Sequence, residues 1–457
     1  MAEYTFDLVV LGGGSGGYAA ALRAAELGMK VALIEKNKVG GTCLHIGCIP
    51  TKALLHAAEI ADDVRDAAHV GVMASYDGID VAGVLGYKDE IISSKFKGLQ
   101  GLIKARGITT IEGTGRLTGP KTVTVGEDAY TGTNVVLATG SYSKLLPGLT
   151  PSSRVLTSEQ ALQLDYVPRK AIILGGGVIG VEFASVWRSF GAEVTIVEGL
   201  PHLVANEDES ISKQFERAYR KRGIEFKLGV FFQSATETPT GVQVTLADGT
   251  TLEGDVLLVA VGRGPVTEGL GYDEQGVTMD RGFVLTNERL ETSLPGVYAV
   301  GDIVPGLQLA HRGFQQGIFV AEELAGLKPI MVPDALIPKV TYSNPEVASI
   351  GLSEAKAAEL HGADAIQAYD YNLAGNGKSH ILGTSGSIKV VRVKNGPVVG
   401  VHMIGARVGE LIGEAQLAVN WDAYPEDIAP LIHAHPTQNE ALGEAFLALA
   451  GKPLHAI

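Results

Sequence analysis

The chain has 457 residues, of which 46% are hydrophobic and 19% are charged, a composition that excludes a disordered protein and a disulfide-stapled miniature scaffold. Its formal net charge of −14 would repel the phosphates of nucleic acids and of anionic membranes, so we expect it to bind neither. The first residues show no secretory or transit pattern and no apolar run is long enough to span a membrane, so we expect a cytoplasmic protein.

The chain begins with a segment typical of a nucleotide-binding unit. Residues 6–36 predict a buried strand, a glycine turn, an alanine-rich helix and a second strand that ends in Glu35. Gly12, Gly14 and Gly17 follow the G-x-G-x-x-G pattern, in which glycines permit a tight turn, close approach of the backbone to a pyrophosphate and close packing of helix on sheet. The helix N-terminus would offer N–H groups to the phosphates. The alternative is an ordinary glycine-rich turn of an α/β sheet.

A second copy of this plan occupies residues 170–199, with Gly175, Gly177 and Gly180 in the turn and Glu198 at the end of the second strand. We therefore expect one chain to bind two dinucleotides. Glu198 would accept hydrogen bonds from a ribose 2′-OH and would repel a 2′-phosphate, and no arginine follows it closely, so this site is expected to prefer NAD to NADP. The alternative for Glu198 is a solvated residue at a strand end.

The rest of the chain predicts further parallel sheet and then a change of architecture. Short apolar strands that end in glycine occur at residues 134–140, 255–262 and 296–302, as in parallel sheets whose ligands lie at the strand C-termini. Beyond the proline-punctuated stretch 328–338, alternating strand-like runs and helices predict a separate domain. We predict an α/β fold with two Rossmann-like dinucleotide-binding domains, the second inserted in the first, and a C-terminal α+β domain. The expected segments are 1–145, 146–265, 266–335 and 336–457.

Cys43 and Cys48 are the only cysteines of the chain. Along a regular helix residues five apart rise by about 7.5 Å, so a disulfide between these two would need a distorted turn, for which Gly47 and Pro50 are suited. So short a loop would stabilise the fold by only about 2 kcal/mol, so a disulfide here is better explained as reactive than as structural. The alternative is two unrelated buried thiols. We expect no metal site, because His45 and two cysteines supply too few ligands for zinc.

Several motifs in a fixed order carry a resemblance to a known family. They are GGGSGG at 12–17, GGTCLHIGCIPTK at 40–52, ATGS at 138–141, GGGVIGVE at 175–182, GVYAVGD at 296–302 and HAHPTQNEA at 433–441. Together they resemble the FAD-dependent pyridine-nucleotide disulfide oxidoreductases, and among these the dihydrolipoamide dehydrogenases, essentially from end to end. The resemblance implies FAD at the first nucleotide site and NAD at the second. It also implies that 1–145 and 266–335 form the FAD-binding domain, that 146–265 forms the NAD-binding domain, and that 336–457 forms the interface of a homodimer.

The resemblance also implies roles for single residues around the cysteines. Cys43 would be the interchange thiol that takes up substrate sulfur, and Cys48 the thiolate that lies against the flavin. Lys52 would supply positive charge near the flavin and would pair with Glu182, which also lies beside the nicotinamide. Without the motif, Lys52 would be taken as a solvated helix residue. The remaining residues expected to contact a cofactor are Thr139, Gly140, Ser141, Val178, Gly262 and Asp302.

The C-terminal motif would supply the acid/base group. Histidine can take a proton from a thiol near neutral pH, and a carboxylate partner fixes its tautomer. His435 and Glu440 match the base and its orienting acid, which in the family come from the partner subunit, whereas His433 is expected to be a packing residue.

The activity implied is the oxidation of protein-bound dihydrolipoamide to lipoamide, with electrons passing through the dithiol and FAD to NAD⁺. The implied partners are the lipoyl domains of a 2-oxoacid dehydrogenase or glycine-cleavage complex. One alternative is another NAD(P)H-dependent FAD disulfide reductase, although Val178 stands where glutathione-type reductases commonly carry a gating tyrosine. A second is a flavoprotein that serves mainly as an assembly subunit. His45, Thr51 and Gly264 depart from the common family pattern.

Overall fold

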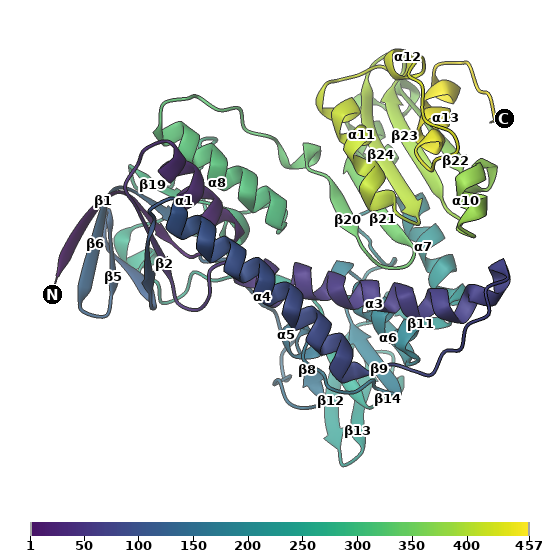
Figure 1. The fold of residues 1–457 in the computed structure, drawn as a ribbon, viewed down its shortest axis with the longest axis horizontal. Coiled ribbons are helices and arrows are strands. Elements are labelled where there is room, and N and C mark those ends of the chain that lie inside the picture. The colour runs from purple at the N-terminus through teal and green to yellow at the C-terminus, as the bar shows by residue number, and fades with distance from the viewer. Residues whose placement is uncertain (1, 456–457) are drawn as a thin grey trace.

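The protein is described here by a computed structural model over residues 2–455, in which the chain forms three lobes (Figure 1). Two lobes contain largely parallel sheets flanked by helices, and the C-terminal lobe contains an antiparallel sheet. This arrangement confirms the predicted α/β fold with two Rossmann-like domains and a C-terminal α+β domain. The long helices α3 (Cys48–Asp66) and α4 (Val81–Ala105) pack against each other, and α3 also packs on the second lobe.

The first lobe is built on a seven-stranded sheet of order β3-β2-β1-β6-β5-β4, with β19 paired to β6. Its strands are β1 (Glu3–Leu11), β2 (Val31–Glu35), β3 (Thr109–Glu112), β4 (Gly115–Gly119), β5 (Thr122–Val125), β6 (Asp128–Leu137) and β19 (Val297–Ala299). Leu8, Val9 and Val10 of the central β1 are fully buried, which explains the continuous apolar run that a parallel strand covered on both faces requires. Helices α1 (Ser15–Glu26) and α8 (Ala310–Leu324) lie side by side against this sheet.

The second lobe is inserted between β6 and β19 of the first. β19 pairs in parallel with β6, so the chain returns to the sheet it left. The outgoing strand β7 (Ser141–Ser143) and the returning strand β16 (Arg263–Pro265) pair antiparallel between the two lobes. The predicted insertion is therefore confirmed, while the boundaries expected at 145, 265 and 335 stay predictions.

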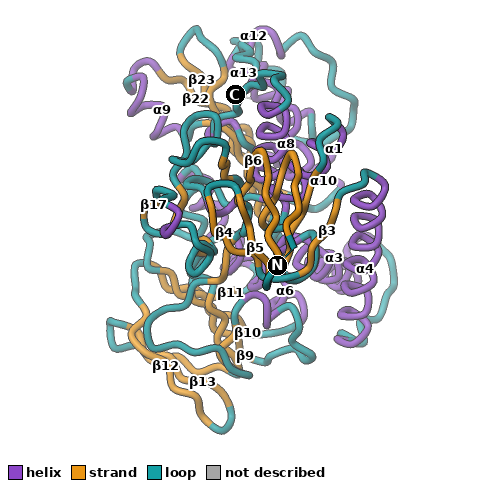
Figure 2. Tube along the Cα trace, turned by 90° about the vertical axis from the view of Figure 1, so that its left-hand side faces the viewer, coloured by secondary structure: helices purple, strands orange, loops and turns teal. Residues whose placement is uncertain are grey.

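The second lobe repeats the plan of the first with a five-stranded parallel sheet of order β11-β10-β9-β15-β8. Its strands are β8 (Val155–Leu156), β9 (Lys170–Leu174), β10 (Glu193–Glu198), β11 (Ile224–Leu228) and β15 (Val256–Val259), and its helices are α5 (Ser158–Ala161), α6 (Val178–Phe190) and α7 (Glu209–Lys221). An antiparallel sheet of β12 (Phe232–Thr238), β13 (Gly241–Leu246) and β14 (Thr251–Gly254) projects from it (Figure 2).

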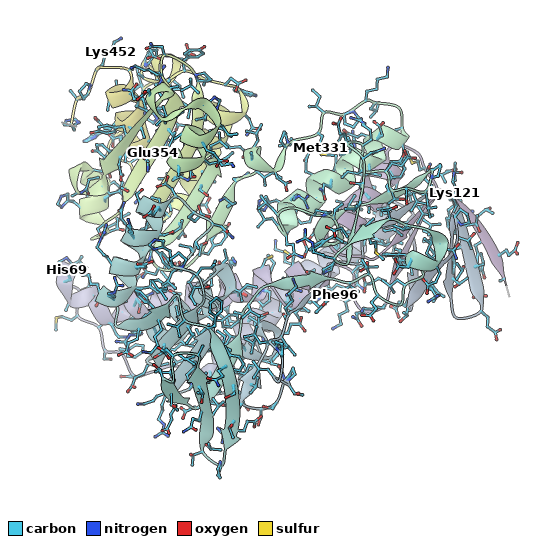
Figure 3. The ribbon with its side chains drawn as sticks, turned by 180° about the vertical axis from the view of Figure 1, so that it is seen from behind. His69, Phe96, Lys121, Met331, Glu354 and Lys452 are labelled. Carbon is cyan, nitrogen blue, oxygen red and sulfur yellow. The ribbon has the colours of Figure 1, made fainter. Side chains whose placement is uncertain are left out.

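The C-terminal lobe follows a connection in which Met331 lies where the chain crosses from the first lobe (Figure 3). Its five-stranded sheet has the order β20-β21-β24-β23-β22, with every pair antiparallel. Its strands are β20 (Lys339–Thr341), β21 (Glu346–Gly351), β22 (Ile366–Asn372), β23 (Ser387–Val393) and β24 (Val398–Gly405). Its helices are α9 (Glu354–His361), α10 (Gly377–Ile381), α11 (Val408–Asn420), α12 (Pro425–Ile428) and α13 (Glu440–Leu449).

The remaining elements are short. They are α2 (Gly41–His45), β17 (Met279–Asp280), β18 (Phe283–Val284) and the single 3₁₀ turns η1 (Ala67–Val70), η2 (Asp273–Gln275), η3 (Gly301–Ile303), η4 (Asp334–Leu336), η5 (Ala363–Ala365) and η6 (Leu373–Gly375). Within residues 2–455, none of the helices combines the length and the apolar character needed to cross a membrane.

Candidate active site

The first glycine turn connects β1 to α1 and has room for a ligand on one side only. A Cβ atom at Gly12 would lie 2.2 Å from the carbonyl oxygen of Ala138, and one at Gly17 would lie 1.8 Å from the carbonyl oxygen of Gly12. A Cβ at Gly14 would instead meet nothing within 4 Å. Gly14 caps α1 without a side-chain hydrogen bond, so the first N–H groups of the helix are free to bind phosphate.

The second turn, between β9 and α6, has the same geometry. A Cβ at Gly175 would lie 2.3 Å from the carbonyl oxygen of Ala260, and one at Gly180 would lie 1.9 Å from that of Gly175. Open space again surrounds Gly177, which caps α6 without a side-chain hydrogen bond. The two turns are thus equivalent cradles, each of which fits a pyrophosphate.

The two acids at the strand ends are also held alike. Glu35 Oε2 accepts a hydrogen bond from the backbone N–H of Gly13 at 2.7 Å, and Glu198 Oε2 accepts one from Gly176 at 2.6 Å. The backbone N–H group two residues after each acid donates to the other carboxylate oxygen, at 2.8 Å in both copies. Each carboxylate is therefore fixed beside its turn, where the ribose of a dinucleotide would lie.

One cavity of about 1330 Å³ connects the two turns. The expected nucleotide-binding residues that line it are Gly14, Gly140, Ser141, Gly175, Gly177, Val178, Glu198, Gly262 and Asp302. The expected residues that do not line it, but shape the turns and strand ends next to it, are Gly12, Gly17, Glu35, Thr139 and Gly180. Cys43, Cys48, Lys52 and Glu182 line the same cavity, so the structure brings these four together with both cradles.

The two cysteines belong to different helices and are both free thiols. Cys43 lies in α2 and Cys48 begins α3. The break at Gly47 provides the interruption of regular helix that pairing would require, and the Thr51 hydroxyl donates to the Gly47 carbonyl at 2.6 Å. The structure thus places the two cysteines of the expected redox pair on either side of this break.

The environment favours a thiolate at Cys48 rather than at Cys43. A hydrogen bond to Cys48 raises the pKa of Cys43, and burial adds to this rise. The same hydrogen bond, helped by the charge of Lys52, lowers the pKa of Cys48 to about 7 despite its burial and the nearby Glu182. Cys48 is therefore the sulfur that carries negative charge near neutral pH.

Lys52 and Glu182 form the ion pair that the resemblance implied. Lys52 Nζ lies 2.9 and 2.8 Å from the two carboxylate oxygens of Glu182, which is only 2% exposed. Burial opposes the charge of Lys52, but attraction to Glu182 raises its pKa above the ordinary value. Sequence reasoning missed Tyr342, whose N–H donates to Glu182 Oε1 at 2.9 Å and whose ring centroid lies 4.7 Å from Lys52 Nζ. The sequence offers only its aromatic ring as a hint, directly after the residues that form β20.

A polar network at the starts of β7 and β16 and in η3 includes a second residue that sequence reasoning missed. The Ser141 hydroxyl donates to Asp302, and Arg263 Nε donates to the Ser141 oxygen at 2.7 Å. Arg263 lines the cavity with both of these residues. Its signal in the sequence is its place directly after Gly262, at a strand end that was expected to bind a cofactor.

Two departures from the family pattern have structural explanations. The His45 ring packs edge-on against Phe96 of α4, with centroids 5.1 Å apart, and its Nε2 bonds the Val39 carbonyl at 2.9 Å. Figure 3 shows Phe96 on this helix. A Cβ at Gly264 would lie 2.6 Å from the Tyr142 ring, which occupies the space that a bulkier residue would fill.

His435 and Glu440 form the expected pair but lie apart from the cavity. His435 Nδ1 lies 2.8 Å from Glu440 Oε1, and Glu440 Oε2 accepts the N–H of Thr437 at 2.7 Å. The His435 side chain is 80% exposed, and neither it nor Glu440 lines the cavity. His433 instead bonds Glu414 at 2.9 Å. Within one chain His435 and the two cysteines therefore do not lie in the same cavity.

Comparison with known families and proteins identifies chains that are similar along nearly the whole length. The family described as pyridine nucleotide-disulphide oxidoreductase matches residues 6–317, and the dimerisation domain of the same family matches residues 337–446. The mitochondrial dihydrolipoyl dehydrogenase of Pisum sativum is 40% identical over 464 residues, which cover 98% of this chain and 92% of the relative. The dihydrolipoyl dehydrogenase of Bacillus subtilis is 40% identical, with 98% and 99% covered. The leghemoglobin reductase of Glycine max is also 40% identical, with 98% and 88% covered.

Solved structures show the same fold along the whole chain. LpdA from Mycobacterium tuberculosis has a TM-score of 0.90 at 25% identity, with 98% of this chain and 100% of that chain covered. A flavoprotein disulfide reductase from Escherichia coli, RclA, solved as a Cu(II) complex, has a TM-score of 0.88 at 27% identity with the same coverage.

Proposed function

The chain belongs to the family of pyridine nucleotide-disulphide oxidoreductases, and from this membership we propose that it is a dihydrolipoyl dehydrogenase that oxidises protein-bound dihydrolipoamide to lipoamide. It is an NAD-dependent flavoprotein that uses FAD and NAD. The observation that carries the proposal is that one cavity contains both glycine cradles and both cysteines. Electrons can then pass between substrate sulfur and a nicotinamide without leaving the cavity.

The residues present fit both cofactors. The space beside Gly14 and the uncapped N-terminus of α1 suit the pyrophosphate of FAD, and those of Gly177 and α6 suit that of NAD. FAD bound in the first cradle would accept two electrons from the dithiol and pass them to NAD⁺ in the second. Asp302, Ser141 and Lys52 are the residues we propose to hold the flavin along the cavity.

The chemistry of the chain's own residues begins with a proton transfer. His435 of the partner subunit, oriented through its Nδ1 by Glu440, would take the proton of a substrate thiol on its Nε2. The substrate thiolate then attacks Cys43 of the oxidised pair. A mixed disulfide forms between substrate and Cys43, the Cys43–Cys48 bond breaks, and Cys48 leaves as a thiolate.

The second half of the reaction releases lipoamide. The second substrate thiol attacks the substrate sulfur that is bonded to Cys43, the bond between that sulfur and Cys43 breaks, and the proton of the attacking thiol passes to the departing Cys43 sulfur. The substrate disulfide closes, and Cys43 is released as a thiol hydrogen-bonded to Cys48. The product has a Cys43 thiol and a Cys48 thiolate, and the raised pKa of Cys43 and the lowered pKa of Cys48 support this distribution of charge.

The dimerisation domain at 337–446 supports a homodimer, in which a second copy would supply the base that the cavity lacks. We propose lipoyl domains of 2-oxoacid dehydrogenase or glycine-cleavage complexes as the protein partners, and the cytoplasm remains our prediction for the location. Residues such as Cys43, Cys48, His435 and Glu440 would have no purpose in a protein that served only as an assembly subunit.

A steady-state assay tests the function. The protein with dihydrolipoamide and NAD⁺ should yield NADH, and Cys48→Ser should abolish turnover because no internal disulfide can form. A protein that reduces NADP⁺ faster than NAD⁺, or that turns over glutathione disulfide but not lipoamide, would show another reductase of the family. Robust turnover by Cys48→Ser would rule out the mechanism.

A further inference from the structure

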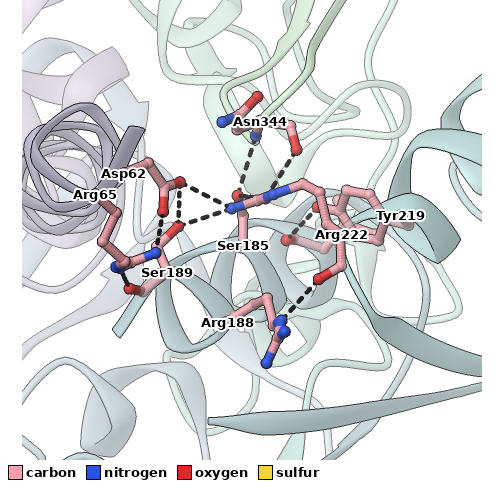
Figure 4. A network of polar contacts seen from close by, with 9 residues as sticks. Asp62, Arg65, Ser185, Arg188, Ser189, Tyr219, Arg222 and Asn344 are labelled. Atoms are coloured by element: carbon pink, nitrogen blue, oxygen red, sulfur yellow. Dashed lines mark hydrogen bonds and ion pairs between the residues drawn. The ribbon is translucent and has the colours of Figure 1, made fainter. Parts of the chain in front are cut away.

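Arg222, the residue that follows α7, connects three parts of the chain through one guanidinium group (Figure 4). Its Nη1 donates to the Ser185 hydroxyl at 2.7 Å and to the Asn344 carbonyl at 2.8 Å. Its Nη2 donates to the Ser189 hydroxyl at 2.7 Å and to Asp62 Oδ2 at 3.1 Å. These partners belong to α6, to the loop between β20 and β21, and to α3. The Arg222 side chain is only 18% exposed.

The helix partners of Arg222 lie on α3 and α6, the two helices that carry the Lys52–Glu182 ion pair. Ser185 follows Glu182 by about one turn of α6, and Ser189 follows it by about two turns, so all three share one helix face. The Ser189 hydroxyl also donates to Asp62 Oδ2 at 2.7 Å, and Asp62 belongs to the same helix as Lys52. The network of Arg222 therefore fixes α3 against α6 at a second place beyond the Lys52–Glu182 pair.

The loop partner of Arg222 belongs to a segment that contacts the ion pair directly. The N–H of Asn344 donates to the Ser185 hydroxyl at 3.0 Å, while the N–H of Tyr342 donates to Glu182 Oε1 at 2.9 Å. Arg222 holds this segment through the Asn344 carbonyl. One planar group with several fixed donors suits such a junction better than the flexible ammonium of a lysine.

Arg222 does not line the cavity and touches none of the expected substrate or cofactor residues. We propose that Arg222 is a positioning residue of the redox site: it holds α3, α6 and the segment 342–344 in the arrangement that keeps the Lys52 ammonium close to Cys48. The inference rests on the proposed function in that Cys48 is the thiolate used in turnover. Loss of the junction lets Lys52 and Glu182 move and weakens the stabilisation of that thiolate.

The test measures the titration of Cys48 itself. Because Cys43 and Cys48 are the only cysteines, Cys43→Ser holoenzyme has a single thiol, whose thiolate absorbs in the ultraviolet and reacts with iodoacetamide. The titrating and charged groups that face Cys48 are Cys43, Lys52 and Glu182. Lys52 and Glu182 are kept in this background, and the Cys43 thiol is exchanged for a hydroxyl that can also donate a hydrogen bond. Arg222→Lys, Arg222→Met and Ser185→Ala are added to it, and the pH profile of the thiolate is recorded for each.

The control is Arg220→Met, which removes an arginine of α7 whose side chain is 60% exposed and which contacts none of the network. Asp62 keeps an ion pair with Arg65 at 2.8 Å when Arg222 is lost, which favours folding of the variants.

We expect Arg222→Met to raise the pKa of Cys48 by about one unit relative to the Cys43→Ser background, with smaller shifts in Arg222→Lys and Ser185→Ala and none in Arg220→Met. At a pH equal to the pKa of that background, such a rise slows alkylation roughly fivefold. A purely structural role would lower the melting temperature and leave the thiolate profile of the folded variants unchanged. An unchanged thiolate profile in every variant that folds overturns the inference, and so does a shift of the Cys48 pKa in Arg220→Met that equals the shift in Arg222→Met. The titration does not depend on turnover, so failure of the dihydrolipoamide assay with intact Cys43 is a separate outcome that concerns only the function.

Discussion

Lys52 Nζ contacts both carboxylate oxygens of Glu182, at 2.9 and 2.8 Å, and so joins the helix of the dithiol to the helix of the second nucleotide turn. Glu182 is 2% exposed, so its charge is compensated by this lysine and by the N–H of Tyr342 rather than by water. A buried pair of this kind is a weak source of net stability, but breaking it is costly. Its position between the thiols and the second cradle points to a role in the chemistry.

Lys52→Met should raise the pKa of Cys48, because the lysine charge lowers that pKa whereas Glu182 raises it. The variant should also lower the free energy of unfolding by about 3 kcal/mol, since a buried carboxylate loses its cation. Thiolate absorbance of the reduced enzyme and denaturant unfolding measure the two effects. Lys95→Met, on the exposed side of α4, should change neither. An unaltered Cys48 titration in Lys52→Met would contradict the electrostatic role of the lysine.

The reduced enzyme should lose its thiolate as the pH falls. Hydrogen bonding from Cys43 and the charge of Lys52 lower the pKa of Cys48 from 9.0 to about 7, so half of the thiolate absorbance should be lost near pH 7. A group whose pKa is lower in the folded state adds stability above its unfolded pKa and loses it as the pH falls through the folded value. The melting temperature of the reduced enzyme should therefore gain from this group between pH 7 and pH 9, and Cys48→Ser should remove that gain. A pH profile identical in the two proteins would show that Cys48 titrates with an ordinary pKa.

The nucleotide turns could be predicted because their determinants are local. Within some thirty residues the sequence contains the buried strand, the glycines and the helix that make each cradle. The carbonyls that exclude a side chain at Gly12 and Gly175 belong to Ala138 and Ala260, which are distant in sequence, so these contacts became visible only in the structure. The ion pair is different, since Lys52 and Glu182 are separated by 130 positions. No periodicity links them, and only the family resemblance did so.

The missed residues are charged or aromatic side chains whose partners are distant in sequence. An arginine such as Arg222 or Arg263 is most often solvated, so its residue type and its neighbours in the sequence give no reason to expect hydrogen bonds to several distant segments. Tyr342 acts partly through its backbone N–H, which no side-chain pattern reveals. His435 and Glu440 were found because they are close in sequence, but their distance from the cavity depends on the packing of whole domains.

Glu198→Ala should weaken NAD binding and the preference over NADP. The carboxylate is fixed by the N–H groups of Gly176 and Leu200. Loss of a hydrogen bond from a ribose hydroxyl to this charged acceptor should raise the KM for NAD⁺ about tenfold. Glu35→Ala removes the equivalent acid of the first turn, so it should weaken FAD retention while leaving the NAD to NADP ratio unchanged. The ratio of kcat/KM values and the flavin content of each variant are the measurements. A ratio unaffected by Glu198→Ala would refute the ribose argument.

A mixed dimer tests whether the site is shared between subunits. His435 is 80% exposed and lies outside the cavity that contains Cys43. His435→Gln alone should lower kcat by about 10²-fold or more through loss of the base, and Cys43→Ser alone should be inactive. Co-expression of the two variants with different affinity tags gives heterodimers in which one site combines an intact dithiol from one chain with an intact base from the other. A random mixture should then recover about a quarter of the parental activity, because half of the dimers are mixed and each has one complete site. If the base and the dithiol of the same chain worked together, every site would carry a defect and the heterodimer would stay as inactive as its parents.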